Sequence, residues 1–283
     1  MFEGVFHTYN LFAEHGFDDP LGETLRLFDL ASGGVLRHVD LSALEQEGND
    51  LASIVSQRKE GVPMEYILGR AVFFGHSLLC TPDTLIPREE TELLVRVAIG
   101  FIEEKLRGKP AITVIDVGTG CGNIAVALAA SSPSVRVMAS DISPAAIEVA
   151  RANVTACGLA DRISLFCGDL LVPFQVEQVG SVDLIVCNPP YIPTPSLSKL
   201  ASEVIDHEPH VALDGGSYGI AIFQRLIHDA PGLLAPGGVL AFEIGAGQER
   251  LVTRLLQRTQ DYEGIQHHDD GEHVRVISAA KRT

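Results

Sequence analysis

The pattern of hydrophobic and polar positions changes near residue 70. The first sixty or so residues read as helical, because two sets of apolar residues recur at the spacing of one helix face. The first set ends at the stop signal Ser32-Gly33-Gly34, and the second lies within residues 41–59. The two sets are Leu25, Leu27, Phe28 and Leu30, and Leu44, Leu51, Ile54 and Val55. We expect residues 1–68 to form a small helical domain.

Short apolar segments follow in residues 69–86. Val72-Phe73-Phe74 and Leu78-Leu79 flank Gly75, a pattern typical of a β-hairpin that turns at the glycine. Prolines near the end of this stretch stiffen it, because the proline ring nearly fixes φ. We interpret residues 69–86 as a hairpin linker.

Strand-like and helix-like patterns alternate in residues 87–283. The expected strands are Ala111–Val117, Val135–Ala139, Ile163–Phe166, Val182–Cys187, Gly238–Ile244 and a closing strand near Val274–Ala279. The expected helices are Asn123–Ala130, one from Ser143-Pro144 to Val149, Ile220–Ala230 and Glu249–Gln257. Such alternation predicts an α/β domain built on a parallel sheet.

Charge and composition narrow the class of partner. The formal net charge is -16, and the 21 lysines and arginines are scattered rather than gathered in one run. Nucleic acid is repelled by such a surface unless its basic residues form a patch. A protein or small-molecule substrate is therefore favoured, and no direct binding of nucleic acid is expected.

The sequence also favours a cytoplasmic protein. No stretch of about eighteen uninterrupted apolar residues is present, so we expect no membrane span, and the N-terminus lacks the features of a secretory signal. The five cysteines are widely spread and form no CxxC pair, which predicts reduced thiols and no zinc site. We interpret His267-His268-Asp269-Asp270 as a solvated turn rather than a metal site.

A glycine-rich turn follows the first expected strand of the α/β domain. It reads Asp116-Val117-Gly118-Thr119-Gly120-Cys121-Gly122. Glycines let the backbone approach a ligand closely, and the helix that follows offers free N–H groups. Dinucleotide sites usually show G-x-G-x-x-G, whereas alternating glycines after an acid are similar to the turn of class I S-adenosylmethionine-dependent methyltransferases. The alternative is a tight turn that only lets the helix pack.

Two further aspartates follow the next two strands. Asp141 ends the second strand, where a carboxylate can accept hydrogen bonds from both ribose hydroxyls. Asp169 follows the third strand, where methyltransferases of this kind hold the adenine. Either alone could be a solvated or capping residue, but both are in register with the glycine turn. Together they predict a site for S-adenosylmethionine.

The fourth strand ends in Asn188-Pro189-Pro190-Tyr191. Ligands bind at the carboxyl ends of parallel strands, and two prolines leave rigid carbonyls without neighbouring N–H groups. The Asn188 side-chain oxygen and the Pro189 carbonyl would therefore form a pair of acceptors for an –NH2 group. Pulling on both N–H bonds aims the nitrogen lone pair at the methyl group, and Tyr191 would cover the nitrogen and exclude water.

These motifs together resemble the HemK/PrmC family, the peptide chain release factor N5-glutamine methyltransferases. Leu85-Ile86-Pro87-Arg88-Glu89-Glu90-Thr91-Glu92 is similar to the family's I-P-R-x-x-T-E segment. Three further sets of residues are similar to the stretches before and after it: Val62-Pro63, Tyr66 and Gly69; Phe73, Gly75 and Pro82; and Glu208-Pro209, Ala212-Leu213, Gly215-Gly216 and Gly219. The resemblance covers residues 60–283.

The resemblance implies a Rossmann-like seven-stranded sheet behind a helical domain that binds substrate, and a glutamine acceptor in the G-G-Q loop of class 1 release factors. The implied cofactor residues are Asp116, Gly118, Thr119, Gly120, Cys121, Gly122, Asp141, Ile142, Asp169, Leu170 and Asn188. The implied catalytic residues are Asn188, Pro189, Pro190 and Tyr191, with Phe73 and Arg88 near the mouth of the site. We expect a monomer with domains at 1–68, 69–86 and 87–283.

Some positions depart from the family pattern and leave alternatives for the acceptor. Glu89 stands where proline is usual, Tyr218 stands where an acid is common, and the ending Asp270–Arg275 is looser. A ribosomal-protein glutamine, a small metabolite or a nucleobase amino group presents a similar planar nitrogen. A non-catalytic protein that only binds the cofactor is a third hypothesis, which intact Asn188 and Tyr191 disfavour.

Overall fold

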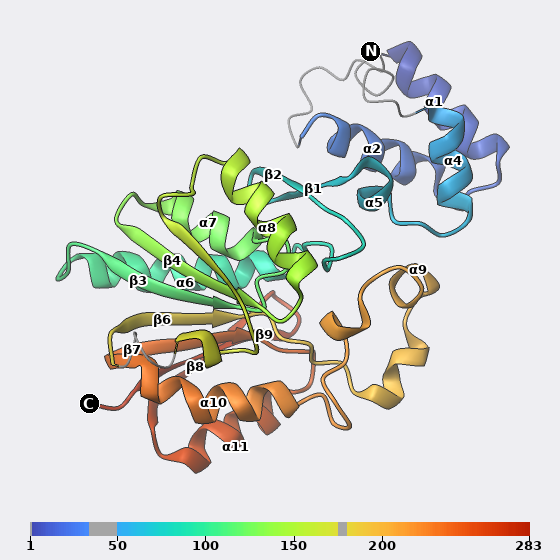
Figure 1. Cartoon of the computed structure of the whole chain (residues 1–283). Coiled ribbons are helices and arrows are strands. Elements are labelled where there is room, and N and C mark those ends of the chain that lie inside the picture. The colour runs from blue at the N-terminus through green and yellow to red at the C-terminus, as the bar shows by residue number, and fades with distance from the viewer. Residues whose placement is uncertain (1, 34–49, 175–179) are drawn as a thin grey trace.

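The computed structural model describes residues 2–33, 50–174 and 180–283. A small helical domain leads through a hairpin into a large α/β domain (Figure 1). The described helices of the small domain are α1 (Phe2–Glu14), α2 (Pro20–Ala31), α4 (Leu51–Lys59) and α5 (Met64–Leu68). Asp19 and Asp50 cap α2 and α4 by accepting backbone N–H bonds with their side chains.

The small domain has its own core. Its buried members come from each of these described helices: Phe12, Leu27, Leu30, Ile54, Val55, Met64 and Leu68. The expected helices are confirmed where the structure describes them, with one correction: Leu25 is 52% exposed, because it faces away from the α2 stripe formed by Leu27 and its neighbours. Leu44 lies outside the described residues.

The predicted hairpin is confirmed. β1 (Arg70–Phe73) and β2 (His76–Leu79) pair antiparallel, and the two residues between them, Phe74 and Gly75, both have positive φ (48° and 77°). Two-residue hairpin turns need this backbone conformation, which glycine adopts without strain. The Asn153 side chain in α8 (Pro144–Ala156) bonds both the N–H and the carbonyl of Leu79, which fixes the hairpin to the large domain.

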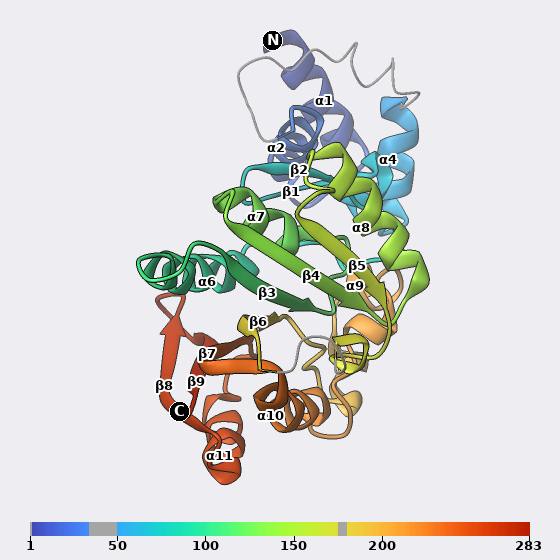
Figure 2. The same cartoon turned by 60° about the vertical axis from the view of Figure 1, so that its left-hand side comes forward.

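The large domain is built on a seven-stranded sheet in the order β5-β4-β3-β6-β7-β9-β8 (Figures 1 and 2). Its strands are β3 (Ile112–Val117), β4 (Val135–Asp141), β5 (Ile163–Cys167), β6 (Val182–Cys187), β7 (Leu234–Glu243), β8 (Tyr262–Asp269) and β9 (Val274–Lys281). The first five are parallel, and β9 is antiparallel to β7 and β8. This is the predicted class I methyltransferase sheet.

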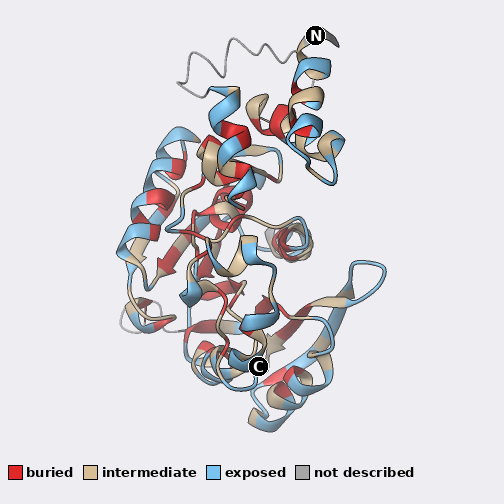
Figure 3. Cartoon of the chain, turned by 90° about the vertical axis from the view of Figure 1, so that its right-hand side faces the viewer, coloured by how far each residue is buried: buried red, intermediate tan, exposed pale blue. Residues whose placement is uncertain are grey.

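Helices cover both faces of the sheet. One face packs α6 (Thr91–Leu106), α7 (Asn123–Ser131) and α8, and the other packs α10 (Ala221–Leu233) and α11 (Glu249–Thr259). Successive strand residues alternate between the two cores, as Val114 and Ile115 do, because side chains along a strand point to opposite faces. The buried residues therefore concentrate on the strands and the inner helix faces (Figure 3).

β8 was not predicted from the sequence, and α8 extends beyond its predicted end at Val149 to Ala156. β8 is an edge strand with few buried residues, so it lacks the apolar run of a central strand. His267 and His268 belong to this strand and bond Thr253 and Ser278, which corrects their interpretation as part of a turn. The turn follows in residues 270–273.

The segment between β6 and α10 contains several short helical turns. This segment includes α9 (Ser202–Ile205) and lies to the right of the sheet in Figure 1. Among the described residues, no helix has the length and apolarity needed to cross a membrane. The same residues hold no group of three or more potential metal ligands.

Candidate active site

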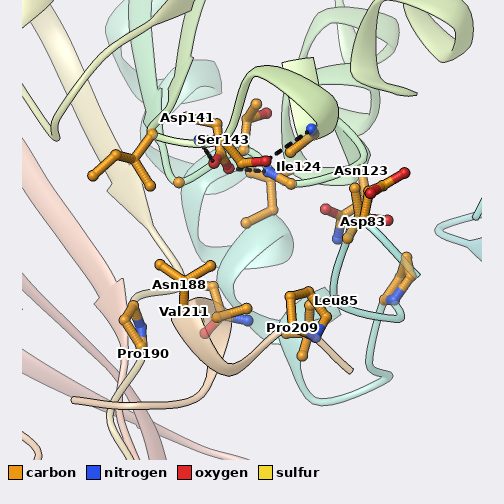
Figure 4. Close-up of a pocket in the computed structure, with 18 of the residues that line it drawn as sticks. Asp83, Leu85, Asn123, Ile124, Asp141, Ser143, Asn188, Pro190, Pro209 and Val211 are labelled. Carbon is orange, nitrogen blue, oxygen red and sulfur yellow. Dashed lines mark hydrogen bonds between the residues drawn. The ribbon is translucent and has the colours of Figure 1, made fainter. Parts of the chain in front are cut away.

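The site lies where the carboxyl ends of β3, β4 and β6 meet. The register pairs Val117 with Ser140 on one side and with Cys187 on the other, so the turns after these strands are adjacent. They enclose a cavity of about 200 Å³ (Figure 4). Eight of the predicted cofactor residues line it: Gly118, Thr119, Gly120, Asp141, Ile142, Asp169, Leu170 and Asn188.

The backbone conformation of the glycine-rich turn after β3 requires glycine at three positions. Gly118, Gly120 and Gly122 all have positive φ (70°, 55° and 85°), a conformation that side chains with a Cβ rarely adopt. The turn is held by the N–H groups of Gly118 and Thr119, which donate to the Ser140 carbonyl at 2.8 and 2.9 Å. Its backbone therefore forms a rigid floor for a ligand.

Asp116 lies behind this floor. Its carboxyl is fully buried, and Oδ2 accepts from the Thr119 hydroxyl at 2.7 Å and from the Ala125 N–H at 3.1 Å. Burial raises the pKa of Asp116 to about 7, and no described residue bonds its Oδ1. Cys121 and Gly122 are also outside the cavity wall. A direct contact of these three residues with the cofactor stays a prediction.

Asp141 faces the cavity with acceptor capacity to spare. Its two oxygens accept one backbone N–H each, from Gly120 and Ser143, both at 2.9 Å (Figure 4). A carboxylate offers about four lone-pair sites, so each oxygen can accept one further hydrogen bond. Desolvation raises the pKa of Asp141, while the backbone N–H groups lower it. A vicinal diol matches the two remaining acceptor positions.

The far end of the cavity is formed by Asp169 and Leu170. Asp169 is half-exposed and accepts from Arg225 of α10 at 2.5 Å. Leu170 has φ of 48°, and its carbonyl accepts from the Ser140 hydroxyl at 2.9 Å. A non-glycine residue in this backbone region is uncommon and is held there by its surroundings. The Leu170 side chain is thereby turned into the cavity wall.

A second cavity of about 220 Å³ meets the first at Asn188. Asn188, Pro189, Tyr191 and Arg88 line it, together with six apolar residues: Leu85, Ile192, Leu200, Val204, Ala212 and Leu213. Pro190 lines the first cavity, beside Asn188 (Figure 4). No described residue donates to the Asn188 Oδ1 or to the Pro189 carbonyl. Two acceptors without a described donor therefore belong to residues that line the second cavity, and one of these residues, Asn188, also lines the first.

Residues distant in sequence fix this acceptor motif. The Asn188 Nδ2 donates to the Thr91 hydroxyl at 3.0 Å, and Thr91 donates to Glu243 at 2.7 Å. The Tyr191 hydroxyl also donates to Glu243, at 3.2 Å. Burial raises the pKa of Glu243, and hydrogen bonds from Thr91 and Tyr191 lower it. Gln248 bonds the Tyr191 carbonyl at 3.0 Å.

The roles of Thr91, Glu243 and Gln248 in fixing the acceptor motif were not predicted from the sequence. Thr91 stood within the quoted I-P-R-x-x-T-E segment, but its hydrogen-bond partner lies 152 positions away. Glu243 is the last residue of β7, and Asn188 directly follows β6, so both lie at the carboxyl ends of buried strands. This position is the signal in the sequence that could have indicated Glu243.

Of the two residues predicted near the mouth of the site, Arg88 lines the cavities and Phe73 lies in the hydrophobic core. Arg88 lines both cavities and forms a tight ion pair with Glu208, which also accepts the Ile86 N–H at 3.2 Å. Phe73 is 1% exposed in the main core and lines neither cavity. Its predicted contact with substrate stays a prediction.

The fold and the paired cavities define the class of protein: a class I S-adenosylmethionine-dependent methyltransferase. Residues 98–220 match the family described as "Methyltransferase small domain". The chain belongs to the release factor glutamine methyltransferase family. It is 42% identical to the release factor glutamine methyltransferase of Gloeobacter violaceus over 221 residues, 78% of this chain and 75% of that protein. With the protein of that name from Geobacter sulfurreducens it shares 39% over 257 residues, 89% and 86% of the two chains.

Solved structures support the fold. The N-terminal domain of human METTL16 in complex with SAH is 19% identical, with a TM-score of 0.54 over 74% of this chain and 77% of that one. The hMettl16 catalytic domain in complex with MAT2A 3'UTR hairpin 1 is 17% identical, with a TM-score of 0.57 over 82% and 79%. At these identities the likeness shows the fold alone. The family membership confirms the predicted family and enzyme class.

Proposed function

We propose that this protein transfers the methyl group of S-adenosylmethionine to the side-chain amide nitrogen of a glutamine in a class 1 peptide chain release factor, in its G-G-Q loop. The observation that carries the proposal is the pair of acceptors without a described donor, the Asn188 Oδ1 and the Pro189 carbonyl, on residues that line the second cavity, of which Asn188 also lines the first. Relatives named release factor glutamine methyltransferase support the choice of acceptor.

The first cavity suits the cofactor by its donors and acceptors. Gly118 and Gly120 offer a close backbone approach, Asp141 has room for two hydroxyl donors, and Leu170 gives an apolar wall. When bound, the cofactor supplies a methyl group on a sulfonium, which is already activated for transfer. The protein therefore needs to align the acceptor nitrogen and needs no strong base.

The second cavity suits a glutamine side chain. Its apolar walls, such as Leu200 and Val204, match an aliphatic stem, and the acceptor pair at its inner end matches an amide –NH2. The amide nitrogen is a poor nucleophile because its lone pair is delocalised into the carbonyl. Acceptors on both N–H bonds favour rehybridisation and hold the lone pair toward the first cavity. Tyr191 lines the same cavity and would cover the amide nitrogen.

The test is a transfer assay with methyl-labelled cofactor and three acceptors: a class 1 release factor, the same factor with its G-G-Q glutamine changed to glutamate, and total RNA. We expect label only in the unchanged release factor. Label in the RNA, with the release factor unlabelled, would contradict the proposal. The predicted monomeric state and cytoplasmic location stay predictions.

A further inference from the structure

Glu243 is a buried carboxyl group that the proposed transfer does not use. It ends β7 and is 2% exposed, yet it lines the second cavity. Each of its oxygens accepts one hydroxyl: Oε2 from Thr91 and Oε1 from Tyr191. Thr91 in turn accepts the Asn188 amide. One carboxylate therefore reaches the acceptor motif by two routes.

When Glu243 is ionised, the donors and acceptors in this chain can be assigned in only one direction. An ionised carboxylate only accepts, so the single hydroxyl proton of Thr91 must point to Glu243. The Thr91 oxygen then meets Asn188 as an acceptor, and only the –NH2 end of Asn188 can supply a proton. If the Asn188 side-chain amide were flipped by 180°, its Oδ1 would face the Thr91 oxygen with no proton between them. In a part-buried site, two unpaired acceptors of this kind cost free energy.

We propose that Glu243 and Thr91 are positioning residues that turn the Asn188 Oδ1 toward the second cavity, so that the site selects a substrate group that donates N–H bonds. This inference rests on the proposed function. A glutamine side chain carries both an –NH2 and a carbonyl oxygen of similar shape. A fixed Oδ1 accepts from the –NH2 and repels the carbonyl oxygen, so the nitrogen is the atom presented to the methyl group.

Three variants test the chain of bonds. Thr91→Val keeps the shape and removes the hydroxyl, Thr91→Ser keeps the hydroxyl, and Glu243→Gln replaces an obligate acceptor by a group that also donates. We expect Thr91→Val and Glu243→Gln to lower kcat by about 10- to 100-fold, because misplacing a reacting group by about 1 Å costs this much. Thr91→Ser should restore most of the rate, and cofactor affinity should stay within about twofold.

Thr24→Val is the matched control. Thr24 is also fully buried and uses its hydroxyl within α2, where it donates to the Pro20 carbonyl at 2.7 Å, far from the acceptor motif in the chain. It should lower the melting temperature without changing kcat per folded molecule. An equal loss of kcat in Thr24→Val and Thr91→Val would overturn the proposal.

A double-mutant cycle separates positioning from a general structural effect. If Glu243 acts through Asn188, then Glu243→Gln should change the rate of Asn188→Ala by no more than about twofold, since coupled residues are not additive. Multiplied effects of the two changes would contradict the proposal.

An NMR measurement needs no acceptor at all. The side-chain amide signal of Asn188, assigned by its loss in Asn188→Ala, should shift in Thr91→Val and stay near its place in Thr91→Ser. An unmoved signal in Thr91→Val would refute the positioning role even in an active enzyme. Conversely, a wild-type protein that leaves release factors unmethylated refutes the proposed function, while the NMR result still decides the positioning role.

Discussion

At the residue scale, Asn188 carries the central chemistry because it belongs to both cavities. It lines both cavities, its Nδ2 donates to Thr91, and no described residue donates to its Oδ1. The sequence predicted the neighbours of Asn188 in the chain, since a motif of consecutive residues shows its chemistry directly. Glu243 could not be paired with Asn188 from the sequence, because only folding brings the two strand ends together.

Replacing Asn188 tests this assignment. We expect Asn188→Ala to raise the activation free energy by about 2–4 kcal/mol, in the range of lost preorganised hydrogen-bonding groups. Single-turnover methylation and equilibrium dialysis with cofactor measure the two effects separately. Cofactor affinity should change less than the rate, and a near-normal rate would show that the acceptor pair does not drive transfer.

Asp116 gives a prediction about pH. Its pKa is raised to about 7 by burial, opposed by Thr119 and the Ala125 N–H and reinforced by Asp141. Folding therefore favours the protonated form, and this contribution to stability is present below the unfolded pKa and is lost as pH rises through about 7.

The matched variant is Asp116→Asn, which cannot titrate. Between about pH 4 and about pH 8, the free energy of unfolding of the wild type should fall relative to this variant by up to about 4 kcal/mol. Urea unfolding of both proteins without cofactor measures the difference. A pH-independent difference would show that Asp116 is not the group that titrates.

At the element scale, the sequence predicted the parallel strands because each is a short β-branched run followed by a turn and a helix. It missed β8, whose exposed edge position leaves few apolar residues to mark it. The loop after Tyr191 depends on close backbone packing that the sequence signals only through its glycines. A Cβ at Gly219 would lie 2.2 Å from the Tyr191 carbonyl oxygen, and φ there is +68°.

Gly219→Ala should therefore damage the acceptor site. We expect a loss of about 1–3 kcal/mol in unfolding free energy, with a larger loss of methylation than of cofactor binding. Gly100→Ala is the control: it lies in α6 with nothing within 4 Å of the added carbon, and it should stabilise by about 0.5–1 kcal/mol. Thermal unfolding and transfer assays compare the two. Full activity in Gly219→Ala would contradict the packing argument.

At the scale of the whole molecule, ion pairs tie the helical domain to the acceptor cavity. Arg58 of α4 is 8% exposed and bonds Glu23 of α2 and Glu203 of α9 at 2.6 and 2.9 Å. The α9 segment carries Val204, a wall of the second cavity. The sequence showed the helical domain and the acceptor motif but no link between them, because the two partners lie 145 positions apart.

Removing the Arg58–Glu203 ion pair should weaken binding of the release factor. We expect Glu203→Gln to raise KM for the release factor by about 3- to 10-fold, because about 1 kcal/mol of pairing is lost from a partly buried site, with cofactor affinity unchanged. Glu148→Gln, in an exposed pair with Arg151, is the control and should leave both constants unchanged. Steady-state kinetics at varied release factor concentration measures KM for both variants. Equal KM values for the two variants would contradict a role of the Arg58–Glu203 pair in acceptor binding.

The most direct test of the central claim is tandem mass spectrometry of a class 1 release factor incubated with this protein and S-adenosylmethionine. The proposal predicts a single methyl group on the side-chain nitrogen of the G-G-Q glutamine, and none with Asn188→Ala. A methyl group on another residue, or an unmodified release factor despite measurable cofactor binding, would contradict it.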